Sequence, residues 1–201
     1  YTGEPYNIIL HSNNGSDTTQ EVAAEFGVNK TLPKNTFTKD HYDFKGWSSF
    51  PSNHNVIYVD EDVVKVNHPE VIGGNTLNLY AVWDIQKYTV EFINGNETIT
   101  QTIEYGSTVQ LPEATNKVGY TFTGWYTESG QQWQEETIVD QNTKLYAKYE
   151  PITYSIEFDG NGADNGNAMD SSKLDVKYNE QATLPENLFT KKYHTFKGWS
   201  T

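Results

Sequence analysis

The sequence "YDFKGWSS" at residues 42–49 decides the fold, because the chain repeats it twice with small changes. It returns as "YTFTGWYT" at residues 120–127 and as "HTFKGWST" at residues 194–201. In all three, an aromatic residue lies three positions before a tryptophan that follows a glycine. A phrase that recurs in this way predicts a small structural unit present in several copies.

The middle copy shows most clearly what the unit contains. Its first run, "YTVEFI" from Tyr88, alternates along the chain, and the alternation resumes in "NETITQTIEYG" after Asn94 and Gly95. Two strand-like runs joined by Asn-Gly are the strongest short-range signal for a β-hairpin, here with a type I′ turn. "STVQLP", "GYTFTGWYT" and "TKLYAKYEP" follow in that order, and their aromatic and β-branched residues favour strands.

The same phrases, found in the same order elsewhere, predict the boundaries of three copies. Variable insertions belong in loops, so the repeated phrases are expected to form the framework. In the insertion of the first copy, a short helix is predicted over residues 61–67, ending before Pro69. The expected division is residues 1–5 as a linker or the end of a preceding module, 6–84 as the first copy with an insertion at about 50–75, 85–150 as the second, and 151–201 as a truncated third without an "LYA" phrase.

Composition excludes several classes of function. The chain has 14 Lys and Arg against 27 Asp and Glu, a net charge of −13, so it would repel nucleic-acid phosphates and anionic lipid. It has no cysteine, which excludes disulfides, thiolate metal sites and cysteine nucleophiles. No run approaches the roughly 18 apolar residues of a membrane span, so no membrane insertion is expected of this stretch. Tyr1 does not open a signal peptide, and the chain is expected to be a fragment of a longer precursor.

The order Tyr-x-[Val/Ile]-x-Phe, Asn-Gly, Tyr-Gly, Leu-Pro, "GYTFTGWYT", "LYAKY" resembles the Listeria-Bacteroides repeat, also called the internalin B-type repeat. The resemblance covers essentially the whole chain. It implies a mostly β fold, α+β at most, of tandem small β-grasp-like (ubiquitin-like) domains strung as an elongated array. It also implies an extracellular place on the bacterial cell surface or cell wall, and it supplies no catalytic motif. The insertion in the first copy departs from the compact pattern of the family.

The repeated aromatic residues allow two interpretations. Trp47, Trp125 and Trp199 could stack on sugar rings, but each follows a glycine and a nearby aromatic residue, which favours a role in a small core. The predicted structural anchors are therefore these three tryptophans with Phe44, Phe122 and Phe196. Trp133, which has no counterpart in the visible sequence of the other copies, is the candidate for an exposed contact, together with Tyr126.

No catalytic, cofactor-binding or metal-binding residue is predicted. "DGNGADNGNAMD" at residues 159–170 is similar to a calcium loop, but Ala163, Asp164 and Asp170 break the pattern, so a hairpin tip is the better interpretation. "LPKNT" at residues 32–36 lacks the register of a wall-sorting signal. The five histidines show no metal-ligand spacing, and the acidic clusters lie outside the repeated phrases, where a solvated face is the usual explanation.

The leading expectation is a non-catalytic spacer or stalk on the cell surface, with a contribution to adhesion. The alternative is a module that binds a glycan or a host receptor through exposed aromatic side chains. A host-surface protein or a glycan would then be the partner. Because a unit without its final strand leaves an unpaired sheet edge, residues 154–201 are expected to associate with a neighbouring molecule or to be poorly ordered.

Overall fold

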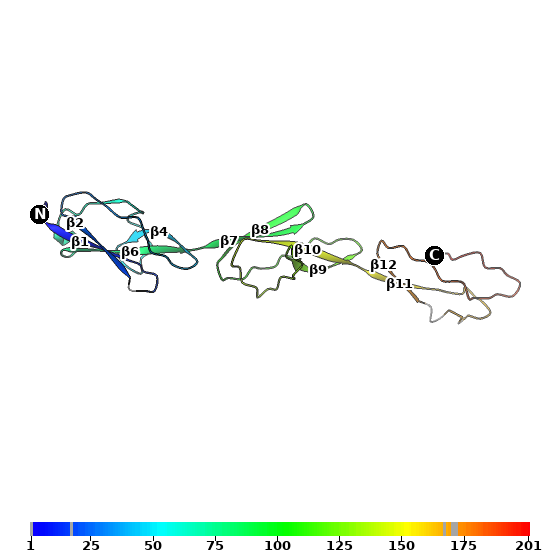
Figure 1. Cartoon of the computed structure of the whole chain (residues 1–201). Coiled ribbons are helices and arrows are strands. Elements are labelled where there is room, and N and C mark those ends of the chain that lie inside the picture. The colour runs from blue at the N-terminus through cyan, green and yellow to red at the C-terminus, as the bar shows by residue number, and fades with distance from the viewer. Residues whose placement is uncertain (1, 17, 167, 170–172) are drawn as a thin grey trace. The chain divides into compact units, whose positions relative to one another are not determined.

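The computed structural model describes residues 2–16, 18–166, 168–169 and 173–201 (Figure 1). Within these ranges the fold is nearly all β: strands alternate with turns, and the only helical element is a short 3₁₀ helix, η1 (Pro69–Val71). The mostly β fold class is therefore confirmed at this level. The chain divides into two compact units, one of Tyr1–Thr89, Thr102–Ser107 and Ile138–Asn142, the other of Val90–Gln101, Thr108–Thr137 and Thr143–Thr201.

The first copy forms a four-stranded sheet. Its spatial order is β2 (Thr19–Glu25), β1 (Pro5–His11), β6 (Thr76–Ile85) and β4 (Tyr42–Ser48). The central pair, β1 and β6, is parallel, whereas β2 and β4 run antiparallel to their neighbours. The "LYA" phrase, near the end of the copy in sequence, thus lies in the middle of the sheet.

Alternation along the strands builds the core of this sheet. Tyr6, Ile8 and Leu10 of β1 are buried, while the residues between them are more exposed, as expected of a strand with one face on a core. The core cluster is completed by residues from the other strands and connectors: Ala24, Phe26, Leu32, Trp47, Val64, Val66, Leu79, Ala81 and Trp83.

The predicted helix over residues 61–67 is wrong. The structure instead has a short strand, β5 (Val63–Val64), paired antiparallel with β3 (Lys30–Thr31). Burial alternates here: Val64 and Val66 are in the core, and the residues beside them are exposed. This period of two belongs to extended backbone, and the pairing with β3 supplies the hydrogen bonds that a helix would have made internally.

The second copy repeats the arrangement with β8 (Glu97–Glu104), β7 (Lys87–Asn94), β10 (Thr143–Pro151) and β9 (Tyr120–Tyr126), again with a parallel central pair, β7 and β10. The predicted hairpin is confirmed, but its turn is shifted by one residue. The two loop residues are Gly95 and Asn96, and only Gly95 has a positive φ, of 62°. The type I′ turn on Asn94 and Gly95 is therefore wrong, because β7 already includes Asn94.

The third copy contains a smaller sheet. Only β11 (Thr153–Glu157) and β12 (Lys173–Lys177) pair, antiparallel, and the phrase at residues 194–201 forms no strand. Every residue of β11 is exposed, in contrast to the buried alternate residues of β1 and β7. Among the described residues from 153 onward, only Met169 is buried.

Candidate functional site

The repeated tryptophans lie in matching aromatic clusters. Trp47 is fully buried, with the rings of Phe44 and Phe37 edge-on to it at centroid distances of 5.0 and 6.2 Å. Trp125 is also buried and meets Phe92 and Phe122 at 5.0 and 5.6 Å. These edge-to-face contacts are the geometry that aromatic pairs prefer in a core.

In the third copy the same cluster is less enclosed. Trp199 contacts Phe158 at 4.8 Å and Phe196 at 5.0 Å, but the indole is only half-buried and Phe196 is 48% exposed. The local spacing of the phrase thus brings the rings together in every copy, whereas burial differs between copies.

The backbone conformation before each tryptophan favours glycine. Gly46, Gly124 and Gly198 have φ values of 146°, 134° and 147°, which residues with a side chain rarely adopt. The register of the ladder shifts here in both complete sheets, as at a β-bulge. A Cβ at residue 46 would lie 2.5 Å from the carbonyl oxygen of Tyr58, so the bulge also passes close to a neighbouring segment.

The structure places the two candidate contact residues, Tyr126 and Trp133, on two paired segments of the second copy. Tyr126 pairs with Gln132, the residue before Trp133, and the Trp133 amide donates a 2.8 Å hydrogen bond to the carbonyl of Trp125. Tyr126 and Trp133 are both half-buried. The Lys148 ammonium nitrogen lies over the ring of Tyr126, 4.3 Å from the ring centroid. Among the described residues the Trp133 indole Nε1 has no hydrogen-bond partner.

Trp133 also has a backbone counterpart that the sequence did not reveal. In the first copy this counterpart is Tyr58, which pairs with Trp47 and whose amide donates to the Trp47 carbonyl at 3.3 Å. The same turn follows in both copies, closed by a bond from the Asp62 amide to the Val59 carbonyl and from the Thr137 amide to the Gln134 carbonyl. Tyr58 and Trp133 are both half-buried.

A contact that sequence reasoning missed occurs between consecutive copies. Gln86, between the first and second copies, donates its amide hydrogen to the carbonyl of His41 at 2.9 Å and accepts from the amide of Tyr105 at 2.8 Å. The Tyr105 ring stacks on the His41 ring, with centroids 3.5 Å apart and planes within 8°. We call this arrangement the first clasp; it lies entirely within the first compact unit.

The second clasp has the same backbone pattern. Ile152 donates to the carbonyl of Gly119 at 2.9 Å and accepts from the amide of Tyr178 at 2.8 Å, all within the second compact unit. The Tyr178 ring covers Gly119 so closely that a Cβ there would overlap it. His41 and Gly119 both have left-handed backbone, with φ of 63° and 77°. The clasp is thus defined by backbone geometry and by a tyrosine ring, and the residue beneath the ring differs.

The matching residue of the third copy is Tyr193. It has the same left-handed backbone, with φ of 64°, and its side chain is 92% exposed. A signal for these positions does exist in the sequence. Each directly precedes the first residue of the repeated phrase, and the clasp tyrosines begin a Tyr-Gly pair at residue 105 and a Tyr-Asn pair at residue 178.

Polar side chains in the third copy hold loops together. Asn165 donates to the carbonyl of Leu188 and accepts from the amide of Thr190, and Asp164 accepts from the amide of Lys192. Asp170, the last residue of the calcium-like sequence, lies outside the described residues. Across the described ranges, no three His, Cys, Asp or Glu side chains are grouped to hold a metal ion.

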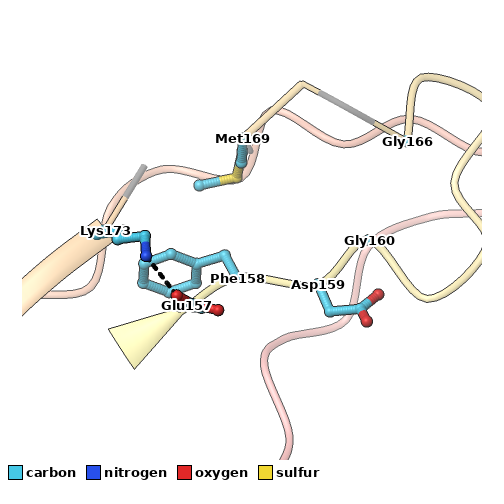
Figure 2. A pocket seen from close by; sticks show the side chains of 7 residues that line it. All are labelled: Glu157, Phe158, Asp159, Gly160, Gly166, Met169 and Lys173. Carbon is cyan, nitrogen blue, oxygen red and sulfur yellow. Dashed lines mark hydrogen bonds and ion pairs between the residues drawn. The ribbon is translucent and has the colours of Figure 1, made fainter. Parts of the chain in front are cut away.

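An open groove lies beside β11 in the third copy. Figure 2 shows Glu157, Phe158 and Asp159 following one another along one wall and Met169 on the other, with an ion pair between Lys173 and Glu157 at one end. Donation from Lys173 holds the pKa of Glu157 below its usual value. This cavity has a volume of about 510 Å³, and a second of about 820 Å³ lies along residues 187–200, lined in part by Phe189, Phe196 and Trp199.

Three known proteins are similar in sequence to this chain. A protein of Evansella cellulosilytica that is provisionally named a membrane protein is 32% identical over 203 residues, which cover 98% of this chain and 28% of that protein. A second protein of that organism, provisionally named a Gly-rich membrane protein, is 31% identical over 186 residues, covering 90% of this chain and 20% of its own length. Internalin H of Listeria monocytogenes is 28% identical over 160 residues, covering 73% of this chain and 28% of its own length.

This chain therefore spans less than a third of the length of these relatives. Within the described ranges no helix is long and apolar enough to cross a membrane. The family model of the Listeria-Bacteroides repeat domain matches residues 6–82, 88–148 and 154–201, one match for each copy. The chain accordingly belongs to the Listeria-Bacteroides repeat family, with three tandem repeats.

Proposed function

We propose that this chain is a non-catalytic tandem repeat region of a bacterial cell-surface or secreted protein, where it acts as a spacer or stalk and contributes to adhesion. The observation that carries the proposal is the clasp, which recurs with the same backbone hydrogen bonds after the first copy and after the second. The names of the relatives, two membrane proteins and an internalin, support a place at the cell surface or wall.

The proposal treats residues 6–84, 85–150 and 151–201 as three β-grasp-like units in an elongated array. The strand order β2-β1-β6-β4, with its parallel central pair, supports this assignment, and the second sheet repeats it. The Leu-Pro phrase lies in an extended connector. This connector occupies the place of the helix in a ubiquitin-like fold.

The clasp would stiffen such a spacer. Two backbone hydrogen bonds at about 1 kcal/mol each and one ring contact at about 1 kcal/mol give roughly 3 kcal/mol for a closed joint. That difference would favour the closed joint by roughly a hundredfold. A joint of this kind resists bending without a large interface.

The distance between two spin labels tests the clasp. The chain has no cysteine of its own, so the labels attach only to the introduced residues of Glu21→Cys and Glu128→Cys, which are both exposed positions. We expect a narrow distribution of label-to-label distances by pulsed electron spin resonance. Tyr105→Ala should broaden the distribution at least twofold, because it removes the stack on His41. Tyr193→Ala is the matched control, since it leaves both clasps intact. A broad distribution in the unsubstituted chain, or equal broadening in the control, would contradict a stiff spacer.

The alternative function is binding of a glycan or a host-surface protein. It is favoured by the half-buried rings of Tyr126 and Trp133, which lie on two paired segments of the second copy. Trp133→Ala is then expected to weaken binding to a glycan array or to host cells at least tenfold, because large aromatic side chains dominate such contacts. Ile57→Ala, at an exposed apolar residue of the first copy, is the control and should leave binding unchanged. Equal binding by both variants would remove this alternative.

A further inference from the structure

The chain contains four Asn-Gly pairs, which begin at residues 14, 94, 161 and 165. The first two belong to the complete sheets, where Asn14 follows β1 and Asn94 ends β7. In both pairs the asparagine is half-buried, and the glycine is exposed with a positive φ, 97° at Gly15 and 62° at Gly95. No atom lies within 4 Å of a Cβ built on either glycine. The two pairs are therefore alike in exposure and in the space around the glycine, so the contacts of the two asparagine side chains can be compared directly.

The side-chain amide of Asn14 is held at both its nitrogen and its oxygen. Its Nδ2 donates a 2.7 Å hydrogen bond to the carbonyl of Thr38. Its Oδ1 accepts from the Ser12 hydroxyl at 2.9 Å, and from the amide and the hydroxyl of Ser16 at 3.0 and 2.7 Å. Turning this amide toward the nitrogen of Gly15 would break these bonds, and each lost bond opposes the rotation.

The side-chain amide of Asn94 is free to turn. No residue in the part of the chain that the structure describes forms a hydrogen bond with it. Gly95 begins the two-residue loop between β7 and β8, and it has no side chain to shield its backbone nitrogen. Rotation of the Asn94 side chain can therefore bring its amide carbon to the Gly95 nitrogen without breaking a side-chain hydrogen bond.

We propose that Asn94 is a site of self-modification by deamidation, and that the hydrogen bonds of Asn14 protect it from the same reaction. The Gly95 nitrogen loses its proton to hydroxide and forms a bond to Cγ of Asn94. The bond between Cγ and Nδ2 breaks, and this nitrogen takes a proton from water and leaves as ammonia. Water then opens the succinimide ring at either carbonyl, which gives aspartate or isoaspartate. The net reaction exchanges ammonia for water and needs no oxidant, reductant or enzyme.

The reaction changes the β7–β8 hairpin in two ways. Either product adds a negative charge beside the loop, three residues before Glu97, the first residue of β8. Isoaspartate also carries the main chain through the side-chain methylene, so one extra backbone atom enters at the end of β7. Because loop length fixes the register of a hairpin, an added atom disturbs the strand pairing beside the loop. The second copy thus undergoes a slow structural change that the first copy resists.

Peptide mapping by mass spectrometry of the whole chain measures the two rates. During incubation at mildly alkaline pH, which favours the deprotonated glycine nitrogen, we expect Asn94 to convert at least tenfold faster than Asn14. In urea the hydrogen bonds of Asn14 are lost, so the two sites should convert at rates within about twofold of each other. The urea sample thereby separates the effect of the fold from that of the neighbouring sequence. Methyl transfer by an isoaspartyl methyltransferase identifies isoaspartate among the products.

Variants of the serines test the cause of the protection. Ser12→Ala combined with Ser16→Ala removes two of the donors to Asn14, so conversion of Asn14 should rise at least threefold while that of Asn94 stays unchanged. Ser16→Ala alone, at an exposed residue, should give a smaller rise, which keeps the test valid if the double variant unfolds. Asn14 conversion that does not respond to either variant would contradict protection by these bonds.

Asn94→Asp tests the structural consequence, because it carries the charge of the product without the extra backbone atom. Hydrogen exchange at residues 93–98 should be faster in the incubated chain than in this variant. Equal conversion of Asn14 and Asn94 in the folded chain, or conversion of Asn94 in urea alone, would overturn the proposal. Exchange in the incubated chain that matches Asn94→Asp would overturn the disturbance of the hairpin. These outcomes do not depend on the clasps or on a bound partner.

Discussion

Replacing Trp125 with alanine is expected to destabilise the second copy by about 3–5 kcal/mol, the usual cost of removing a large buried aromatic side chain. The indole is 2% exposed and packs edge-to-face with Phe92 and Phe122. Its Nε1 also donates a 2.9 Å hydrogen bond to the carbonyl of Pro112, which would lose this donor. Urea unfolding, with hydrogen exchange to locate the affected strands, measures the loss.

Trp199→Ala provides a control within the same chain. The residue occupies the same place in the repeated phrase and touches Phe158 and Phe196, but it is only half-buried and β11 beside it is exposed. Because less apolar surface would return to water, its cost is expected to be about 1 kcal/mol or less. Equal losses for Trp125→Ala and Trp199→Ala would show that the contribution of the tryptophan does not depend on the strand that covers it.

Gly46→Ala is expected to destabilise the first copy by about 2–4 kcal/mol. Two effects add: a residue with a Cβ is disfavoured at φ of 146°, and the Cβ would lie 2.5 Å from both the Tyr58 carbonyl oxygen and a methyl group of Val56. The Tyr58 carbonyl cannot move away easily, because the backbone of Tyr58 is hydrogen-bonded to that of Trp47 through both its amide and its carbonyl. Thermal unfolding followed by circular dichroism measures the change.

Gly198→Ala separates these two effects. Its φ of 147° matches that of Gly46, yet no atom lies within 4 Å of an added Cβ. The substitution carries the conformational cost alone, about 1 kcal/mol. If both alanine variants lost the same stability, the close approach of Tyr58 would have no energetic consequence.

Several elements could be predicted from the sequence because their causes are local. The spacing of the phrase places an aromatic ring against the tryptophan in each copy, and alternation with Asn-Gly indicated the β7–β8 hairpin. The exact turn was missed by one residue, since the φ that matters belongs to Gly95. The helix over residues 61–67 was wrong because it ignored the burial of alternate valines against a distant strand.

Matching the repeated phrases locates the clasp positions, but it does not predict the contacts that these residues make. Each clasp joins three short segments, and the residue under the tyrosine ring is His41 in one clasp and Gly119 in the other. Both residues have a left-handed backbone and a carbonyl that accepts a hydrogen bond. Neither property follows from residue identity, because one clasp has a histidine at this position and the other has a glycine. The correspondence of Trp133 with Tyr58 was missed as well, because the two positions carry different residues.

The sequence by itself determined that the chain contains three copies of one strand-rich unit, and it determined where the aromatic clusters form. Both depend on residues a few positions apart. The tertiary structure alone decided which of these clusters are buried. Phe44 with Trp47 and Phe196 with Trp199 have nearly the same sequence and the same ring geometry, yet only Trp47 is enclosed. Enclosure requires a strand far along the chain to lie between two others, and in the third copy no described residue takes that place.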